Sequence, residues 1–185
     1  MMITLTGFMG SGKTTVGKVL ADFLGCPFMD LDDLVVKKAG KSIPDIFAQD
    51  GEPAFRELEA QVLRKTVAKF AESTAVLALG GGAVLAPASA ALLQEKTVCI
   101  YLRATLDTLL ARLAGETAGR PLLQEIPDQV GDDGGSVVMP GPDRASVSAR
   151  LASREPIYEK TAHVIIDTDG LSPDEVADEI IISAL

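Results

Sequence analysis

The sequence predicts an α/β protein of three layers, α/β/α, in which helices cover both faces of a five-stranded parallel sheet. Short apolar segments alternate along the chain with helical patterns, and strands that are joined through helices lie parallel. The first apolar segment runs into a glycine-rich turn and then a helical pattern, which is typical of a strand-loop-helix unit. The length of 185 residues suits one core, so we expect a single domain over residues 1–185.

The first strand is expected at residues 3–6, where the chain is apolar and β-branched. The residues that follow, Gly7 to Thr14, fit the pattern G-x-x-x-x-G-K-[ST] of a phosphate-binding loop. Its glycines let the backbone turn its N–H groups toward polyphosphate oxygens at the start of a helix. Lys13 would then reach the β- and γ-phosphates, and the Thr14 hydroxyl would bind Mg²⁺. The alternative is a glycine-rich turn without a ligand.

A helix follows the loop, because apolar residues recur there with helical spacing and Gly25 supplies a stop. The second strand, at residues 26–29, runs into Asp30, Asp32 and Asp33. Open α/β sheets bind ligands where strands end, and in an extended register Asp30 and Asp32 share a side. Two carboxylates beside phosphates hold Mg²⁺ or accept a proton, so beside this loop we favour a functional pair over a solvated helix N-terminus.

The helices expected next are residues 33–39, a short helix from Ser42 or Asp45, and a longer helix from Glu52. On the longer helix, Arg56 and Glu59 lie three residues apart, beside the apolar stripe, and can form an ion pair. One interpretation is a solvated pair of little energetic weight. The other is an arginine that a carboxylate holds in place, so that its fork can bind an acidic substrate.

The third strand, at residues 75–79, ends in Gly80, Gly81 and Gly82. Glycine at a strand end lets backbone N–H groups approach a ligand closely, although a plain strand-to-helix turn explains these residues equally well. The remaining elements are a helix at 87–94, a strand at 97–102, a helix at 105–113 that contains Arg112, and a strand at 164–167. The last helix starts with Pro173, and Ser172 and Glu175 have the spacing of a capping box.

Residues 124–143 differ in composition from the rest of the chain, since they are rich in Gly, Pro and Asp and contain no Lys or Arg. We expect a mobile loop there, with Arg120 before it and Arg144, Arg150 and Arg154 after it. A lid over a nucleotide would suit these flanking arginines, because phosphoryl transfer needs positive charge at the γ-phosphate. For the acidic middle of the segment we favour a tolerated surface insertion.

The net charge of −9 argues against broad binding of nucleic acid or anionic membranes, so an anionic ligand needs a local basic pocket. No apolar run has the length of a membrane span, and the first residues have no pattern of a cleaved signal, so we expect a cytoplasmic protein. Cys26 and Cys99 lack metal-ligand spacing and are expected to be buried, reduced thiols. His163, the only histidine, opens a strand and is expected to be structural.

Several separated motifs together resemble those of shikimate kinases, over nearly the whole chain. The motifs are Gly7 to Gly17, Phe28-Met29-Asp30-Leu31-Asp32, Phe55-Arg56-Glu57-Leu58-Glu59, Gly80-Gly81-Gly82, Arg120-Pro121-Leu122-Leu123 and Arg154-Glu155-Pro156-Ile157-Tyr158. The resemblance implies a P-loop kinase fold and the ATP-dependent phosphorylation of the 3-hydroxyl of shikimate. It also implies Mg²⁺ as cofactor and a monomer, with a small molecule rather than a nucleic acid or a membrane as partner.

The resemblance further implies roles for individual residues. The catalytic residues are Lys13, Asp32 as proton acceptor, and Arg120. The nucleotide-binding residues are Gly10, Ser11, Gly12, Lys13, Thr14, Thr15, Arg112, Arg120 and Pro173, of which Arg112 and Pro173 border the adenine. Thr14 and Asp30 serve Mg²⁺, the latter through water. The substrate-binding residues are Asp32, Arg56, Glu59, Gly81, Gly82 and Arg154, with Phe47 and Phe55 lining the pocket.

By this resemblance, residues 31–60 form the substrate-binding segment, and residues 114–150 contain the lid and the acidic insertion. The stretch between Arg120 and Arg154 is longer than the family pattern, so lid residues other than Arg120 are not assigned. Alternatives are a kinase for gluconate or a nucleotide, and a nucleotide-binding regulatory module without turnover. A guanine-reading Asn-Lys-x-Asp motif does not occur, which argues against a GTPase.

Overall fold

The computed structural model describes residues 1–117 and 144–184, so Arg120 and the acidic segment 124–143 lie outside the described residues. The described chain forms a five-stranded parallel sheet with the order β2-β3-β1-β4-β5. The strands are β1 (Met2–Thr6), β2 (Phe28–Asp30), β3 (Ala75–Ala78), β4 (Val98–Arg103) and β5 (Val164–Asp167). The predicted fold class is therefore confirmed, and each strand lies within two residues of its predicted position.

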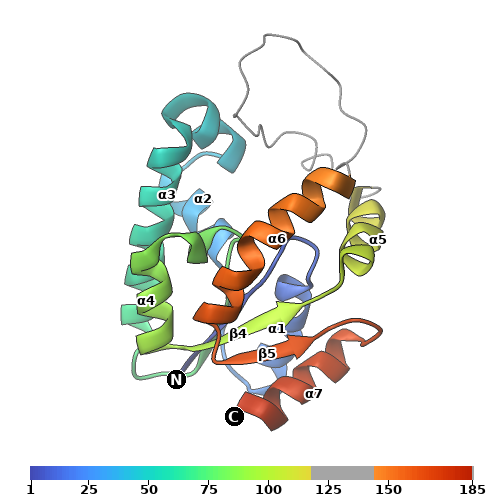
Figure 1. Cartoon of the computed structure of the whole chain (residues 1–185). Coiled ribbons are helices and arrows are strands. Elements are labelled where there is room, and N and C mark those ends of the chain that lie inside the picture. Colours follow the sequence, from blue (N-terminus) through green and yellow to red (C-terminus); the bar gives the residue numbers. More distant parts are fainter. Residues whose placement is uncertain (118–143, 185) are drawn as a thin grey trace.

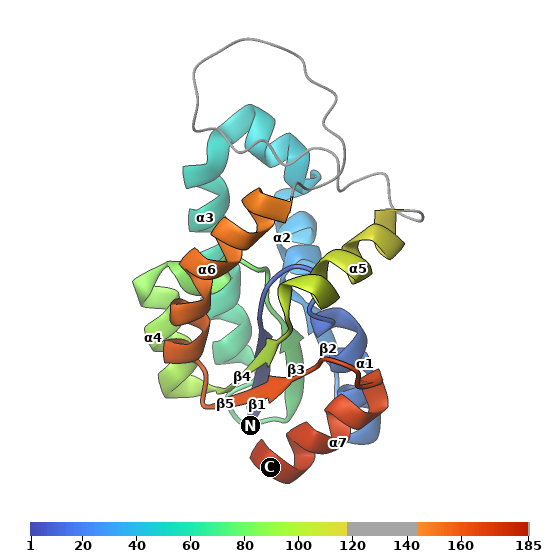
Figure 2. The same ribbon diagram turned by 45° about the vertical axis from the view of Figure 1, so that its right-hand side comes forward.

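Helices cover both faces of this sheet (Figure 1). The helices α1 (Lys13–Phe23) and α7 (Pro173–Ala184) pack together on one face. The opposite face carries α3 (Ile43–Lys69), α4 (Pro87–Lys96) and α6 (Arg144–Thr161), as the turned view shows (Figure 2). The other helices are α2 (Leu31–Ala39), which packs on α3, α5 (Leu106–Thr117), and the short 3₁₀ helix η1 (Ala83–Leu85).

The central strand β1 is buried along its whole length, because helices cover it on both sides. Ile3 and Leu5 face α1 and α7, whereas Met2 belongs to the cluster under α3, α4 and α6. Gly17 of α1 lets this helix approach the sheet, since a Cβ atom there would lie 2.6 Å from the Phe28 ring. The fold therefore fixes the start of α1, and with it the phosphate loop, against the sheet.

The helices expected from Ser42 and from Glu52 are confirmed as the two regular stretches of α3, which meet at a kink at Gly51, whose φ of 81° is not helical. Ser42 is the N-cap of the first stretch, so this helix begins one residue later, at Ile43. One helix was missed in the sequence. Helix α6 was not predicted, because its buried residues are few and widely spaced, so an apolar stripe is hard to see in the sequence.

Local predictions elsewhere are mostly confirmed. Ser172 and Glu175 form the capping box, in which the Ser172 N–H donates to Glu175 Oε2 at 2.8 Å. His163 is structural, since its Nδ1 accepts from the Cys99 N–H at 3.0 Å. Cys99 is buried, and burial raises its thiol pKa to about 11, whereas Cys26, in the short segment before β2, is only partly buried. Among the described residues, no helix combines the length and apolarity needed to cross a membrane.

Candidate active site

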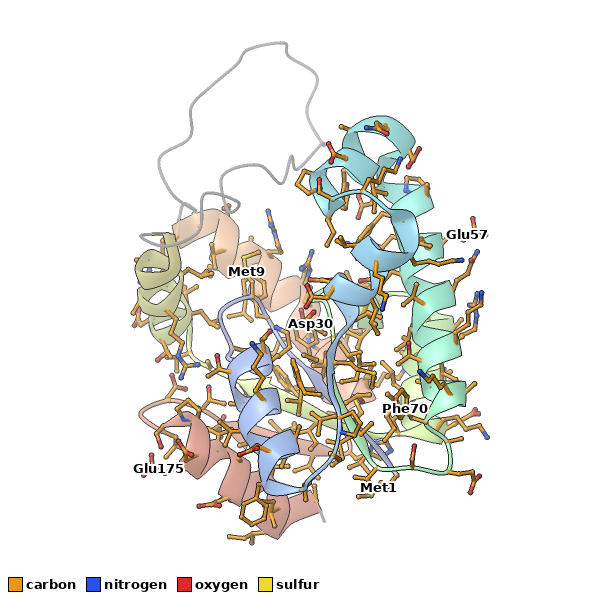
Figure 3. All side chains as sticks on the ribbon, turned by 180° about the vertical axis from the view of Figure 1, so that it is seen from behind. Met1, Met9, Asp30, Glu57, Phe70 and Glu175 are labelled. Carbon is orange, nitrogen blue, oxygen red and sulfur yellow. The ribbon has the colours of Figure 1, made fainter. Side chains whose placement is uncertain are left out.

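The candidate residues gather at the carboxyl ends of the strands, where open α/β sheets bind ligands. The phosphate loop follows β1, Asp30 ends β2, and Gly80 to Gly82 follow β3. Met9 of the loop and Asp30 both lie at this end of the molecule (Figure 3). Because β3 pairs with both β1 and β2, the segments after these strands are neighbours although they are distant in sequence.

The phosphate loop is shaped by glycines with positive φ. Gly7, Gly10 and Gly12 have φ angles of 145°, 78° and 93°, which other residues rarely adopt. The Lys13 ammonium donates to the carbonyl oxygens of Gly7 at 3.0 Å and Phe8 at 2.8 Å, so it folds over the loop. Within the described residues, the buried Ser11 hydroxyl has no hydrogen-bond partner. A lysine, an unpartnered hydroxyl and a helix N-terminus in one loop fit a bound polyphosphate.

Asp30 connects this loop to the next helix. Its Oδ2 accepts from the Thr14 hydroxyl at 2.9 Å, and its Oδ1 accepts from the Asp32 N–H at 3.0 Å, which caps α2. Hydroxyl and carboxylate oxygens are ligands of the kind that Mg²⁺ prefers, directly or through water. The pair Thr14 and Asp30 therefore fits a magnesium site, and the same carboxylate fixes the start of the helix that carries Asp32.

Asp32 lies in an environment that disfavours its charged form. Burial raises the pKa of this carboxyl and the nearby Asp30 raises it further, whereas Lys13 lowers it. A Cβ atom on Gly80 would lie 2.8 Å from Asp32 Oδ1 and 2.9 Å from Glu59 Oε1. The first glycine of the triplet thus leaves room for two carboxylates, and the raised pKa suits a group that accepts a proton.

Arg56 is held over the last glycine of the triplet. Its Nη1 donates to Glu59 Oε2 at 3.0 Å, and a Cβ atom on Gly82 would lie 2.5 Å from Nη1. The predicted pairing of Arg56 with Glu59 is therefore present. Glu59 is 5% exposed, and burial raises its pKa although Arg56 lowers it. The guanidinium also lies 5.2 Å from the centre of the Phe55 ring.

A second carboxylate on Arg56, that of Glu52, was not predicted as a site residue. Glu52 Oε1 accepts from Arg56 Nε at 3.3 Å and from Nη2 at 3.2 Å. Its spacing of four residues from Arg56 is the helical pairing signal that would have found it. The interruption of α3 at Gly51 puts Glu52 at the start of the regular helix that carries Arg56.

Helix α6 brings Arg154 and Tyr158 to the same place. The Tyr158 hydroxyl donates to the Gly81 carbonyl oxygen at 2.5 Å, and its ring lies 5.1 Å from that of Tyr101. Burial raises the pKa of Tyr158, while the nearby positive charges of Arg154 and Arg56 lower that pKa. Both arginines therefore lie close enough to influence one hydroxyl. A role for Tyr158 was missed because α6 itself was not predicted.

Arg112 borders the phosphate loop on its other side. Its Nη2 donates to the Thr168 carbonyl oxygen at 2.8 Å, and its Nη1 donates to Thr168 Oγ1 at 3.1 Å and to the Ser11 carbonyl oxygen at 3.4 Å. Thr168 was not predicted as a neighbour of the site. Pro173 starts α7 at the end of the segment that follows Thr168, so Arg112 and this segment flank the loop.

Other predicted residues lie in simpler surroundings. Thr15 is exposed in the first turn of α1, and Phe47 stacks on Phe55 with ring centres 4.8 Å apart. Arg144 is exposed and pairs with Asp107 at 2.6 Å, so it does not belong to the cluster around Gly81. A separate groove of about 360 Å³ lies between α2 and α3, and none of the predicted site residues lines it.

A parallel sheet of this order, with a phosphate loop after β1 and a carboxylate at the end of β2, defines a P-loop kinase. The family model described as shikimate kinase matches residues 9–184 of the chain. The chain belongs to the shikimate kinase family, whose members are ATP-dependent phosphotransferases that act on a hydroxyl group.

Relatives and solved structures agree with this assignment. The chain is 45% identical to the shikimate kinase of Salinibacter ruber over 91% of this chain and 78% of the relative. It is 39% identical to that of Enterococcus faecalis over 97% of this chain and 95% of the relative. The structure of Acinetobacter baumannii shikimate kinase in complex with shikimate matches with a TM-score of 0.79 and 32% identity, over 97% of this chain and 90% of that chain.

Proposed function

We propose that the protein transfers the γ-phosphoryl group of ATP to the 3-hydroxyl of shikimate, giving shikimate 3-phosphate and ADP. One observation carries this proposal. Asp32, Arg56 and Tyr158 surround the Gly80 to Gly82 backbone directly beside the phosphate loop, and Arg154 is near enough to lower the pKa of Tyr158. Two arginines that could bind a carboxylate, and an aspartate that could accept a proton, are thus found near a loop that fits polyphosphate, which supports a hydroxy acid as the substrate.

In this proposal the donor side binds ATP. The backbone N–H groups of the loop, at Gly10, Ser11, Gly12, Thr14 and Thr15, and the Lys13 ammonium hold the phosphates. Lys13 then exchanges the loop carbonyls that it contacts now for phosphate oxygens. Arg112 and Pro173 border the adenine. Thr14 and Asp30 would hold Mg²⁺, the latter through water, and the ion would neutralise charge on the phosphates.

On the acceptor side, Arg56 and Arg154 bind the carboxylate of shikimate, and Glu59 orients Arg56. The N–H groups of Gly81 and Gly82 donate to the substrate. Asp32 positions the hydroxyl and takes its proton while the oxygen bonds to the γ-phosphorus and the bond to the β-phosphate oxygen breaks, releasing ADP. The substrate-binding segment at residues 31–60 carries much of this side.

We further propose that Arg120 reaches the transferring phosphate from a lid within residues 114–150. Arg120 lies outside the described residues, so its role rests on the motif alone. The protein is proposed to act as a monomer in the cytoplasm. Two free cysteines fit a reducing compartment of that kind.

The test is a coupled ADP-release assay with ATP, Mg²⁺ and a panel of shikimate, gluconate and a nucleoside monophosphate. We expect turnover with shikimate only, and loss of that turnover when EDTA removes the metal. The product is identified by ³¹P and ¹H NMR, which distinguish the 3-phosphate from other regioisomers. Turnover with gluconate or the nucleotide but not with shikimate would reject the proposal.

A further inference from the structure

Arg56 offers five N–H donors, and carboxylates in this structure take much of that capacity. Glu59 accepts from Nη1, and Glu52 accepts from both Nε and Nη2 through one oxygen. The Nε and Nη2 donors form one edge of the guanidinium fork, and such an edge can bind a carboxylate in a bidentate manner. Glu52 therefore lies where a substrate carboxylate would make its strongest contact with Arg56.

The two acidic partners of Arg56 differ in how firmly they are held. Glu59 is 5% exposed and lies against Gly80, so its carboxylate stays in place. Glu52 is 63% exposed and has water available to replace Arg56. Exposed pairs contribute little free energy, because solvent screens them and two long side chains must be ordered. Glu52 is thus the displaceable partner and Glu59 the permanent one.

The negative charges around Arg56 also compete with a substrate carboxylate. Glu52 and Glu59 contact this arginine, and both Glu59 and the nearby Asp32 would meet the Cβ of a residue at Gly80, so a third carboxylate lies close to the pair. An incoming carboxylate therefore meets an arginine whose charge is already balanced by acidic neighbours. Removing the charge of Glu52 leaves more positive potential for the substrate.

Building on the proposed function, we infer that Glu52 is an internal competitor for the substrate carboxylate, which must displace Glu52 from the Nε and Nη2 edge of Arg56. Glu52 then acts on substrate affinity and leaves the chemical step unchanged, because it touches Arg56 rather than the reacting atoms. It also disfavours acids that bind Arg56 alone, since a ligand that engages Arg154 as well has more binding energy to offset the displacement.

The test compares Glu52→Gln with Glu57→Gln. Glu57 lies on the same helix, accepts from Gln61 and projects away from the sheet, so it is a matched loss of one exposed charge (Figure 3). Shikimate is titrated calorimetrically into each protein without nucleotide, and kcat and both KM values are measured. For Glu52→Gln we expect the Kd and KM of shikimate to fall about two- to fivefold, the range of an exposed ion pair, with kcat and the KM of ATP unchanged.

Glu57→Gln should match the wild type in every measurement. Weaker shikimate binding in Glu52→Gln would show that Glu52 orients Arg56 for the substrate, and unchanged binding would show that Glu52 has no influence on it. Either result would overturn the inference. Glu52→Ala provides a second variant with the same expected direction, and melting temperatures verify that both fold. Wild-type turnover tests the proposed function by itself. If the wild type phosphorylates shikimate, the proposed function holds, and the ratio of the shikimate Kd of the wild type to that of Glu52→Gln tests the role of Glu52 as competitor. If the wild type neither binds nor phosphorylates shikimate, both hypotheses fail.

Discussion

Gly7 and Gly82 both lie where a Cβ atom would collide, but with different parts of the molecule. At Gly7 the atom would be 2.6 Å from the Leu102 carbonyl oxygen of the neighbouring strand, at a φ of 145°. At Gly82 it would be 2.5 Å from Arg56 Nη1, the end of a long side chain. A backbone oxygen in a sheet cannot move aside, whereas a guanidinium can. A side chain added at Gly7 therefore disturbs the fold, whereas a side chain added at Gly82 disturbs the position of Arg56, which is proposed to bind the substrate.

This difference extends to the two halves of the site. The donor half is one continuous loop whose geometry is set by backbone conformation and by carbonyl contacts to Lys13. The acceptor half is assembled from α2, α3, the turn after β3, and α6, and it acts through charged side chains. Substrate choice can thus change through single side chains while the nucleotide loop and the fold stay intact. The predictions below probe this separation.

The largest effect is expected for Asp32→Asn. The amide keeps the size of the side chain and leaves the cap from Asp30 to the Asp32 N–H in place, but it no longer accepts the proton. We predict that kcat falls by roughly 10²- to 10⁴-fold, while a non-hydrolysable ATP analogue binds as before. Steady-state kinetics and calorimetry measure the two effects. Near-normal kcat would remove Asp32 from the role of base.

A smaller effect on affinity is expected for Gly82→Ala. The added Cβ displaces the Arg56 guanidinium from its position. Because this weakens a charge-assisted hydrogen bond to the substrate, the KM of shikimate should rise roughly tenfold to hundredfold. Gly81→Ala is the matched comparison, because its Cβ would meet nothing closer than 3.7 Å. Its effect on KM should be clearly smaller. Equal effects of the two variants would show that Arg56 displacement is not the cause.

Tyr158→Phe should have a weaker effect that is again confined to the acceptor half. The variant keeps the packing against Tyr101 but removes the donor that fixes the Gly81 carbonyl, and with it the orientation of the following Gly82 N–H. Loss of one neutral hydrogen bond predicts a rise of about two- to tenfold in the KM of shikimate, with the KM of ATP unchanged. A parallel loss of ATP affinity would indicate general structural damage instead.

The smallest effect concerns pH. Asp32 is active when deprotonated, and burial and Asp30 raise its pKa, so acidification inactivates the enzyme at a higher pH than the ordinary Asp value of 3.8 predicts. Asp33 is exposed and also raises the pKa of Asp32. We therefore expect Asp33→Asn to move the acidic limb of the kcat profile slightly to lower pH without changing its plateau. A shift to higher pH would contradict the assignment of Asp32.

The sequence predicted the donor half better than the acceptor half for a physical reason. The loop is local, so its spacing alone indicates the strand, the turn and the helix around Lys13. The contact between Tyr158 and Gly81 joins residues far apart in sequence, and it depends on α6, whose weak apolar pattern hides the helix. Glu52 was interpreted only as the start of a helix, which it is, and its contact with Arg56 four residues later was not considered.

The separation of the two halves is tested most directly by calorimetric titration of Arg154→Ala with each ligand in turn. Arg154 is partly exposed on α6 and is near enough to Tyr158 to lower the pKa of its hydroxyl. We predict that a non-hydrolysable ATP analogue with Mg²⁺ binds this variant as it binds the wild type, while shikimate binds roughly tenfold to hundredfold more weakly. Unchanged shikimate binding, or an equal loss for the nucleotide, would contradict the account.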